Sequence, residues 1–105
     1  MLIYNTTFYI EKGAVTEGLE YLKKQYIPAA TAGGLVTEPR MSRVLAAPGA
    51  GEGESISVQF RVADTDTLNR WTAQYGQPLQ RSLMERFGEK MVGFSTVLEE
   101  IDWRK

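Results

Sequence analysis

The side chains that could do chemistry in this chain are amides, hydroxyls, aromatic rings and guanidinium groups. The 105 residues include no histidine and no cysteine. The usual general base, the thiolate nucleophile and the common nitrogen and sulfur ligands of zinc and haem iron are therefore excluded. The carboxylates show no pairing typical of acid–base catalysis. We therefore expect no metal and no cofactor.

The candidate binding residues lie on segments that alternate in polarity, as strands do. Residues 2–10 and 55–62 alternate most clearly, with Leu2, Tyr4 and Phe8 on the core face of the first segment. Alternation assigns the following residues to the opposite, uncovered face: Ile3, Asn5, Thr7, Tyr9, Ser55, Ser57, Gln59 and Arg61. The same alternation in a last strand at 90–101 favours a core face made of Val92, Phe94, Thr96 and Leu98. The uncovered face of that strand would then carry Met91, Gly93, Ser95, Val97 and Ile101. The strand at 40–47 is ambiguous, and the pattern favours Met41, Arg43 and Leu45 for the uncovered face.

Two helices separate these strands. The spacing of Val15, Leu19, Leu22 and Tyr26 predicts the first, with a kink or a new final turn at Pro28. Gly33-Gly34 ends it. The second begins with N-cap residues in 64–67, carries an apolar stripe that includes Trp71 and Tyr75, is interrupted at residues 76–78 and stops at Gly88. Residues 48–53 read as a hairpin loop.

The element order is β-α-β-β-α-β within a single domain of residues 1–105. It predicts an α+β, ferredoxin-like fold, a four-stranded antiparallel sheet with two helices on one face. The uncovered face mixes apolar and polar residues. That mixture favours a homodimer in which two sheets pack together as a dimeric α/β barrel, and a simple solvated sheet is the alternative.

The candidate pocket lies between the sheet and the second helix. Its candidate residues are Asn5, Thr7, Tyr9, Arg43, Gln59, Arg61, Trp71, Tyr75 and Ser95. The two arginines would suit an anionic ligand, and the pocket as a whole a small amphipathic one. Structural roles compete with each assignment. Asn5 would bond to Gln59 or Ser95 across the strands, the aromatic residues would pack in the core, and the arginines would pair with Glu99, Glu100 or acids of a second subunit.

The topology, the Asn-Thr-Thr triplet at residues 5–7 and the Trp-Thr pair at 71–72 resemble the dimeric α/β-barrel superfamily of antibiotic-biosynthesis and haem-degrading monooxygenases. In the haem-degrading members, the resemblance implies an asparagine and a tryptophan beside the substrate, here Asn5 and Trp71. It also implies a haem-binding histidine further along the second helix. The stretch WTAQYGQPLQRSL contains none, and Arg81 cannot ligate iron. The resemblance therefore implies the fold and the pocket, but not haem degradation.

Nearly the whole chain resembles a small bacterial family of unknown function, through IYNTTFYI, YIPAA, SVQFRV and RFGEKMVGFSTVLE. Together these observations predict a small soluble homodimeric protein that binds a small ligand. Two alternatives stay open, a cofactor-independent monooxygenase-like enzyme and a non-enzymatic protein-interaction or regulatory domain. Ligand identity and catalysis are not determined by the sequence.

The charge and hydropathy patterns bear on location and on other partners. The net charge of −1 gives no electrostatic footprint for nucleic acid or an anionic membrane. The chain has no basic leader before its first apolar stretch and no run of membrane-spanning length. We therefore expect a cytoplasmic protein that binds neither nucleic acid nor a membrane.

Overall fold

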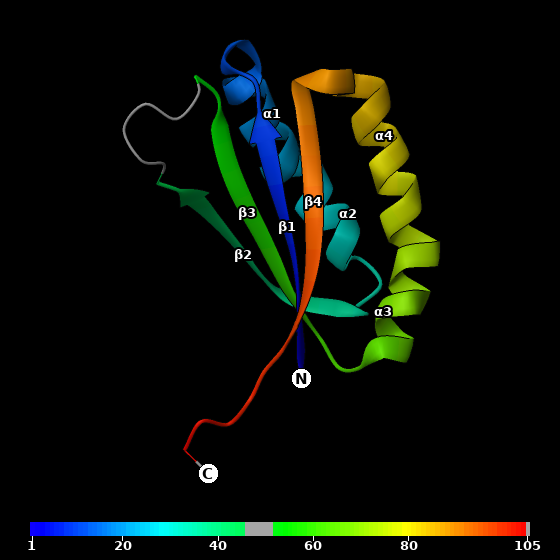
Figure 1. Cartoon of the computed structure of the whole chain (residues 1–105). Coiled ribbons are helices and arrows are strands. Elements are labelled where there is room, and N and C mark those ends of the chain that lie inside the picture. The colour runs from blue at the N-terminus through cyan, green and yellow to red at the C-terminus, as the bar shows by residue number, and fades with distance from the viewer. Residues whose placement is uncertain (46–51, 105) are drawn as a thin grey trace.

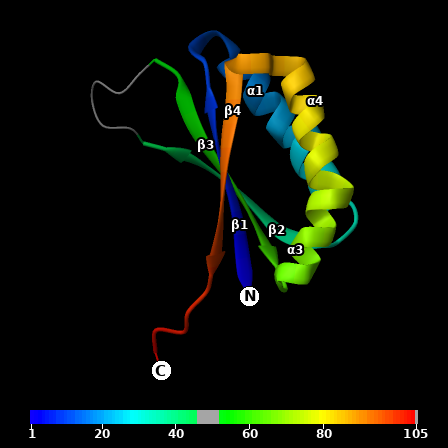
Figure 2. The same cartoon turned by 45° about the vertical axis from the view of Figure 1, so that its right-hand side comes forward.

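Four antiparallel strands form one sheet in the computed structural model, which describes residues 1–45 and 52–104. They are β1 (Leu2–Ile10), β2 (Val36–Val44), β3 (Glu54–Val62) and β4 (Met91–Glu99), in the order β2-β3-β1-β4. The helices lie together on one face of this sheet (Figures 1 and 2). The predicted β-α-β-β-α-β arrangement is confirmed. Positions 46–51, which hold most of the predicted hairpin loop and the end of the predicted second strand, lie outside the described residues.

Each predicted helix is two α-helical segments joined by a wider π-helical turn. In the first, α1 (Val15–Tyr21) and α2 (Ile27–Thr31) flank η2 (Leu22–Tyr26). In the second, α3 (Thr65–Trp71) and α4 (Gln77–Phe87) flank η3 (Thr72–Gly76). Short 3₁₀ turns, η1 (Lys12–Ala14) and η4 (Gly88–Lys90), precede α1 and follow α4.

The two prolines explain why π turns occur at these places. A proline inside an α-helix lacks the amide that donates to the fourth residue back, and its ring collides with that carbonyl. Just before Pro28, the Ile27 amide donates instead to the Leu22 carbonyl, five residues back. Just before Pro78, the Gln77 amide donates to the Thr72 carbonyl in the same way. The expected interruption at residues 76–78 takes the form of this π turn at Thr72–Gly76, through which the helix continues.

Both ends of the second helix lie where the sequence predicts them. The Asp64 carboxylate accepts a hydrogen bond of 2.8 Å from the Thr67 amide, which is the expected N-cap. A hydrogen bond from the Thr67 hydroxyl, together with this amide bond, holds the pKa of Asp64 below its ordinary value. Gly88 ends the helix with φ +56°, a conformation that glycine adopts readily.

The core lies between the sheet and the helices and is rich in aromatic rings. Phe8 meets Tyr26 edge to face at a centroid distance of 5.3 Å, and Tyr21 meets Phe87 at 5.4 Å. The predicted core faces of β1 and β3 are confirmed, since Phe8, Ile10, Ile56, Val58, Phe60 and Val62 are all buried.

The predicted faces of β4 were wrong. Its register with β1 pairs Thr6 with Ser95 and Ile10 with Met91. The helix side of β4 therefore carries Met91, Gly93, Ser95 and Val97, and the open face carries Val92, Phe94, Thr96 and Leu98. Both faces hold apolar residues, so alternation alone does not distinguish them. Buried Met91 belongs on the helix side because it packs over Gly18, where even a Cβ would lie 2.7 Å from the Met91 methyl carbon.

The preferred face of β2 was also wrong, because a β-bulge reverses its alternation. The register shifts between Thr37 and Arg40, and Glu38 in the bulge has φ +50°. Beyond the bulge, Met41 pairs with Val58 and Arg43 with Ile56, which places both on the helix side. The predicted β4 residue Ile101 lies past the strand, which ends at Glu99.

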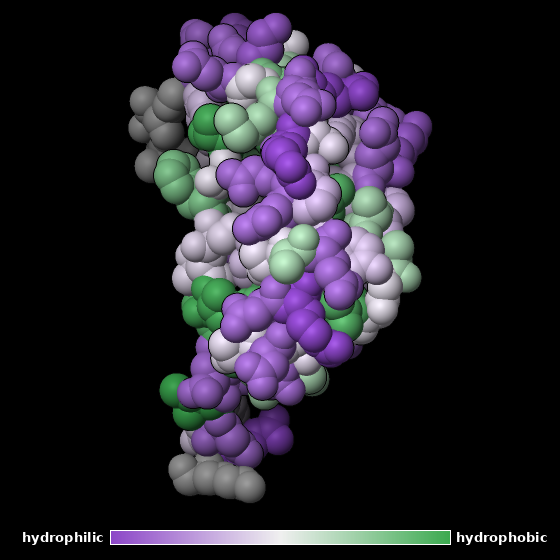
Figure 3. All heavy atoms as spheres, turned by 90° about the vertical axis from the view of Figure 1, so that its right-hand side faces the viewer, coloured by the Kyte–Doolittle hydropathy of each residue, from purple (hydrophilic) through white to green (hydrophobic). Residues whose placement is uncertain are grey.

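The open face of the sheet keeps its mixed character with partly different residues. Its centre is polar, whereas its apolar residues are Ile3, Tyr9, Val44, Val92, Phe94 and Leu98. Figure 3 views the molecule from the α4 side, where the surface is mostly hydrophilic with scattered apolar groups. Within residues 1–45 and 52–104, no helix is both long enough and apolar enough to cross a membrane.

Candidate functional site

Asn5, the first of the predicted site residues, is engaged in a local network on the open face. Its side-chain oxygen accepts a hydrogen bond of 2.5 Å from the Ser57 hydroxyl, and its amide nitrogen donates to the Thr7 hydroxyl at 3.3 Å. The cross-strand partner is thus Ser57, rather than the expected Gln59 or Ser95. Gln59 and Tyr9 share this face, and the Tyr9 hydroxyl accepts from the Gly53 amide at 3.2 Å. These residues point away from the helices.

The two candidate arginines do not converge on one ligand. Arg61 lies on the open face and pairs with Glu38 at 3.0 Å and with Glu100. Arg43 lies on the helix side and pairs with Glu54 at 2.5 Å. Each guanidinium therefore has a carboxylate partner. Glu100 was an expected partner, whereas Glu54 was not.

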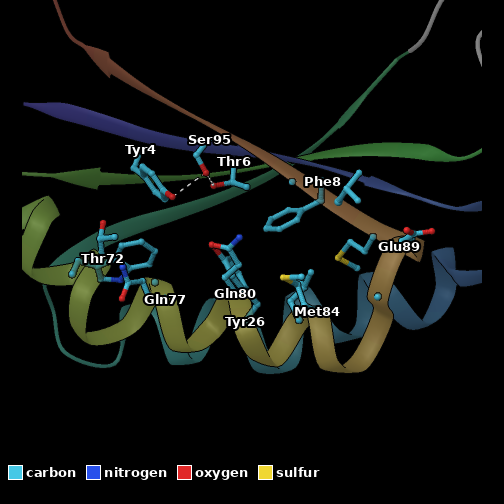
Figure 4. Close-up of a pocket in the computed structure, with 17 residues that line it drawn as sticks. Tyr4, Thr6, Phe8, Tyr26, Thr72, Gln77, Gln80, Met84, Glu89 and Ser95 are labelled. Carbon is cyan, nitrogen blue, oxygen red and sulfur yellow. Dashed lines mark hydrogen bonds between the residues drawn. The ribbon is translucent and has the colours of Figure 1, made fainter.

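A cavity of about 450 Å³ lies on the helix side of the sheet, between the β1–β4 strand pair and the second helix. Figure 4 shows the strands forming one wall and the helix the other. The cavity is lined by Tyr4, Thr6, Phe8, Tyr26, Trp71, Thr72, Gly76, Gln77, Gln80, Leu83, Met84, Gly88, Glu89, Met91, Val92, Gly93 and Ser95. Of the predicted site residues, Trp71 and Ser95 contribute to this lining.

Three hydroxyl groups meet on the strand wall of the cavity. The Tyr4 hydroxyl donates to the Ser95 hydroxyl at 2.9 Å, and the hydroxyls of Ser95 and Thr6 share a second bond of 2.9 Å (Figure 4). The register of β4 creates this cluster, because it sets Ser95 directly opposite Thr6. The other strand residues that line the cavity, Phe8, Met91, Val92 and Gly93, have no polar side-chain group.

Trp71 lines the cavity and also belongs to the core. Its ring is 1% exposed and lies with its centroid 5.2 Å from that of Tyr4 and 6.3 Å from that of Phe60. Its indole nitrogen donates to the Ala30 carbonyl at 2.9 Å, which ties the second helix to the first. The expected core role is therefore present, and Trp71 lines the cavity as well.

Glycines give the cavity part of its shape. A Cβ on Gly76, in the π turn, would lie 2.8 Å from the Trp71 ring. A Cβ on Gly93 would lie 3.1 Å from the Phe8 ring. Tyr75, the neighbour of Gly76, turns away from the cavity and packs over Gly33, where a Cβ would lie 2.2 Å from its hydroxyl.

We expect Gly76→Ala to lower the stability of the protein, although alanine favours a helix by about 1 kcal/mol. The Trp71 ring cannot move aside, because it is packed and hydrogen-bonded, and overpacking costs about 1–3 kcal/mol. The net loss should reach up to about 2 kcal/mol in urea unfolding. Gly13→Ala is the matched control, since its Cβ would meet nothing within 4 Å. Equal stabilisation by both changes would show that the Trp71 contact is not rigid.

The cavity is electrically neutral at its hydroxyl end. Among the described residues that line it, none is lysine or arginine, and the single carboxylate, Glu89, lies at the opposite end from Tyr4 and Ser95 (Figure 4). Burial raises the pKa of the Tyr26 phenol, an effect that a hydrogen bond with Thr6 opposes. Tyr26 therefore stays protonated at neutral pH, so its hydroxyl keeps a proton to donate.

Sequence reasoning missed most of the polar lining, namely Tyr4, Thr6, Thr72, Gln77, Gln80 and Glu89. Thr6 was the available signal, because a hydroxyl between Tyr4 and Phe8 on a core face needs a partner. Within the described part of the chain, no group of three or more Asp, Glu, His or Cys side chains could hold a metal ion.

Comparison with family models gives the chain a place among known proteins. A model described as a domain of unknown function, DUF4286, matches residues 1–101. The chain belongs to this family. No curated protein matches it.

Solved structures of the same fold exist at low sequence identity. A dimeric ferredoxin-like protein from an uncultured marine organism has a TM-score of 0.71 at 10% identity, covering 96% of each chain. An ethyl tert-butyl ether d (EthD) family protein from Bacillus halodurans has a TM-score of 0.70 at 14% identity, covering 96% of this chain and 100% of its own. HapK from Hahella chejuensis has a TM-score of 0.68 at 9% identity, covering 96% and 93%. At these identities the likeness establishes the ferredoxin-like fold.

Proposed function

We propose that this DUF4286 protein binds a small ligand in the cavity between the sheet and the second helix. The cavity itself carries the proposal. Its volume of about 450 Å³ lies within the range of small-molecule sites, and mainly apolar walls with a few convergent polar groups are typical of them. Gly76 and Gly93 belong to this lining and let the rings of Trp71 and Phe8 approach the backbone closely.

We propose further that the protein acts as a homodimer through its open sheet face. Apolar residues along β4 and β1, including Phe94, Leu98 and Ile3, are placed on that face, where the helices do not cover them. A structural neighbour that spans 96% of the chain is described as dimeric. In such a dimer the ligand cavity, on the helix side, stays accessible. Sedimentation as a monomer at micromolar concentration would contradict the dimer.

The ligand site can be tested by a screen of charged and uncharged fragments, followed through the backbone amide signals in nuclear magnetic resonance. We expect binders to shift the signals of Thr6, Ser95 and Thr72. Ser95→Leu, which places a larger side chain in the cavity and removes the hydroxyl, should weaken binding at least tenfold, equivalent to about 1.4 kcal/mol. Val97→Leu is the control, because Val97 lies on the same face of β4 but does not line the cavity.

Two results would overturn the ligand site. In one, no fragment shifts any amide of the cavity lining. In the other, binding is equally strong in Ser95→Leu and in Val97→Leu, so the fragments bind elsewhere. The enrichment of shifts around Ser95 distinguishes cavity binding from weak binding spread over the surface.

A further inference from the structure

We infer that the natural ligand is an uncharged, largely apolar molecule that places one hydrogen-bond-accepting oxygen, such as a ketone, against the hydroxyls of Tyr4, Thr6 and Ser95. This inference rests on the proposed ligand-binding function and specifies its chemistry. It concerns which ligands the cavity admits, and it follows from the protons and charges of the lining.

The hydroxyl cluster has one more proton than its own hydrogen bonds use. Tyr4, Ser95 and Thr6 carry three hydroxyl protons, and two hydrogen bonds join the three oxygens. Since Tyr4 donates to Ser95, the proton left over is on Ser95 or Thr6. In either arrangement one O–H of the cluster is left to donate, so the cavity has a place for an acceptor.

The charges of the cavity lining disfavour an anionic ligand. Both neutral carbonyls and carboxylates accept hydrogen bonds, but burying a carboxylate without a cationic partner costs far more. No lysine or arginine belongs to the described lining, and Arg43 and Arg61 are held by carboxylates outside it. Glu89 adds a negative charge to the far end. The anionic ligand expected from the two arginines is therefore disfavoured in this cavity.

The aromatic lining of the cavity favours a flat, apolar ligand. The rings of Phe8, Tyr26 and Trp71 line the cavity, and the hydroxyl cluster lies on its sheet wall (Figure 4). Aromatic side chains bury large apolar areas and favour flat partners. A two-ring aromatic ketone is therefore a suitable probe of both features.

The test compares three probes that share one ring system, 2-acetylnaphthalene, naphthalene and 2-naphthoate, at pH 7. Binding can be followed through Trp71 fluorescence in a Trp103→Phe background, because the chain has only these two tryptophans. We expect the ketone to bind about tenfold more tightly than the hydrocarbon, as one hydrogen bond of about 1.4 kcal/mol would give. The ketone should also bind at least tenfold more tightly than the carboxylate.

The hydroxyl assignment is tested by the variant Tyr4→Phe/Thr6→Val/Ser95→Ala, which keeps the cavity but removes three protons. The advantage of the ketone over naphthalene should fall below twofold. An advantage that persists would contradict the cluster, since Tyr26 would then be the donor. If this variant does not fold, amide shifts decide. The ketone must move the Thr6 and Ser95 signals of the unmodified cluster more than naphthalene does, and equal shifts would overturn the assignment.

Different results would overturn the uncharged ligand class and the ligand site itself. Equal or tighter binding of 2-naphthoate would overturn the uncharged class while leaving a functioning cavity. Absence of binding by all three probes, with other fragments still shifting the cavity amides, would likewise overturn only the ligand class. If no fragment reaches the cavity, the proposed function fails as well.

Discussion

Replacing Trp71 with alanine should lower the free energy of unfolding by about 3–5 kcal/mol, the range for large buried aromatic residues. Trp71 is 1% exposed, contacts the rings of Tyr4 and Phe60, and donates to the Ala30 carbonyl. Its removal would join the space of the indole to the ligand cavity and leave that carbonyl without its donor. For a domain of this size, such a loss is a large share of the total stability.

Two further variants separate the contributions of the indole. Trp71→Phe keeps an aromatic ring but not the N–H, so we expect a smaller loss, of which about 1–3 kcal/mol comes from the unpaired carbonyl. Trp103→Ala changes the other tryptophan, which is 81% exposed, and should alter stability by less than about 0.5 kcal/mol. Urea unfolding measures the stability of all three variants. The protein concentration must be the same in each experiment, because dimerisation makes stability depend on concentration. A loss below about 1 kcal/mol in Trp71→Ala would contradict the packing.

Trp71 also illustrates why the fold could be predicted more easily than the site. Its place on an apolar stripe with Leu68 predicted a core position, and strong alternation in β1 and β3 predicted the sheet. The four strands and two helices follow from such local periodicity. The cavity depends instead on which residues of distant elements meet, and local periodicity does not contain that information.

Ser95 shows the same limit within one strand. It was a candidate for the open face but lies on the helix side, because β4 carries apolar residues on both faces and its register is set by Met91 over Gly18. Once Ser95 is placed opposite Thr6, the two hydroxyls explain each other. Thr6 alone could not be interpreted, since its partner lies 89 residues away along the chain.

Arg43 was misplaced for a different reason. An unbroken strand beginning at buried Val36 would put Arg40 and Ser42 on the helix side, but the bulge around Glu38 reverses the alternation and brings Met41 and Arg43 there instead. A bulge at Glu38-Pro39 is compatible with an edge strand, yet its exact position requires the structure.

The corrected orientation of β4 leads to the second large expected effect, in which Phe94→Glu converts the proposed dimer into monomers. Phe94 is 70% exposed in one subunit and lies on the open face between Val92 and Thr96. Packed against a second sheet, its ring would be desolvated, and fully desolvated aromatic residues of an interface can contribute about 2 kcal/mol or more. A glutamate at that position would lose this contact and bring an unpaired charge into the interface.

The matched control is Val97→Glu, which introduces the same charge on the same strand. Val97 is also well exposed, at 50%, but its side chain lies on the helix side of β4. In sedimentation velocity at about 10–100 μM, we expect Phe94→Glu to sediment as a monomer, with the dissociation constant raised at least about thirtyfold, and Val97→Glu to remain dimeric. The opposite pattern would place the dimer contact on the other face of the strand. Because the hydroxyl cluster lies on the helix side, monomeric Phe94→Glu should still bind the ligand, which separates the role of the open face from that of the cavity.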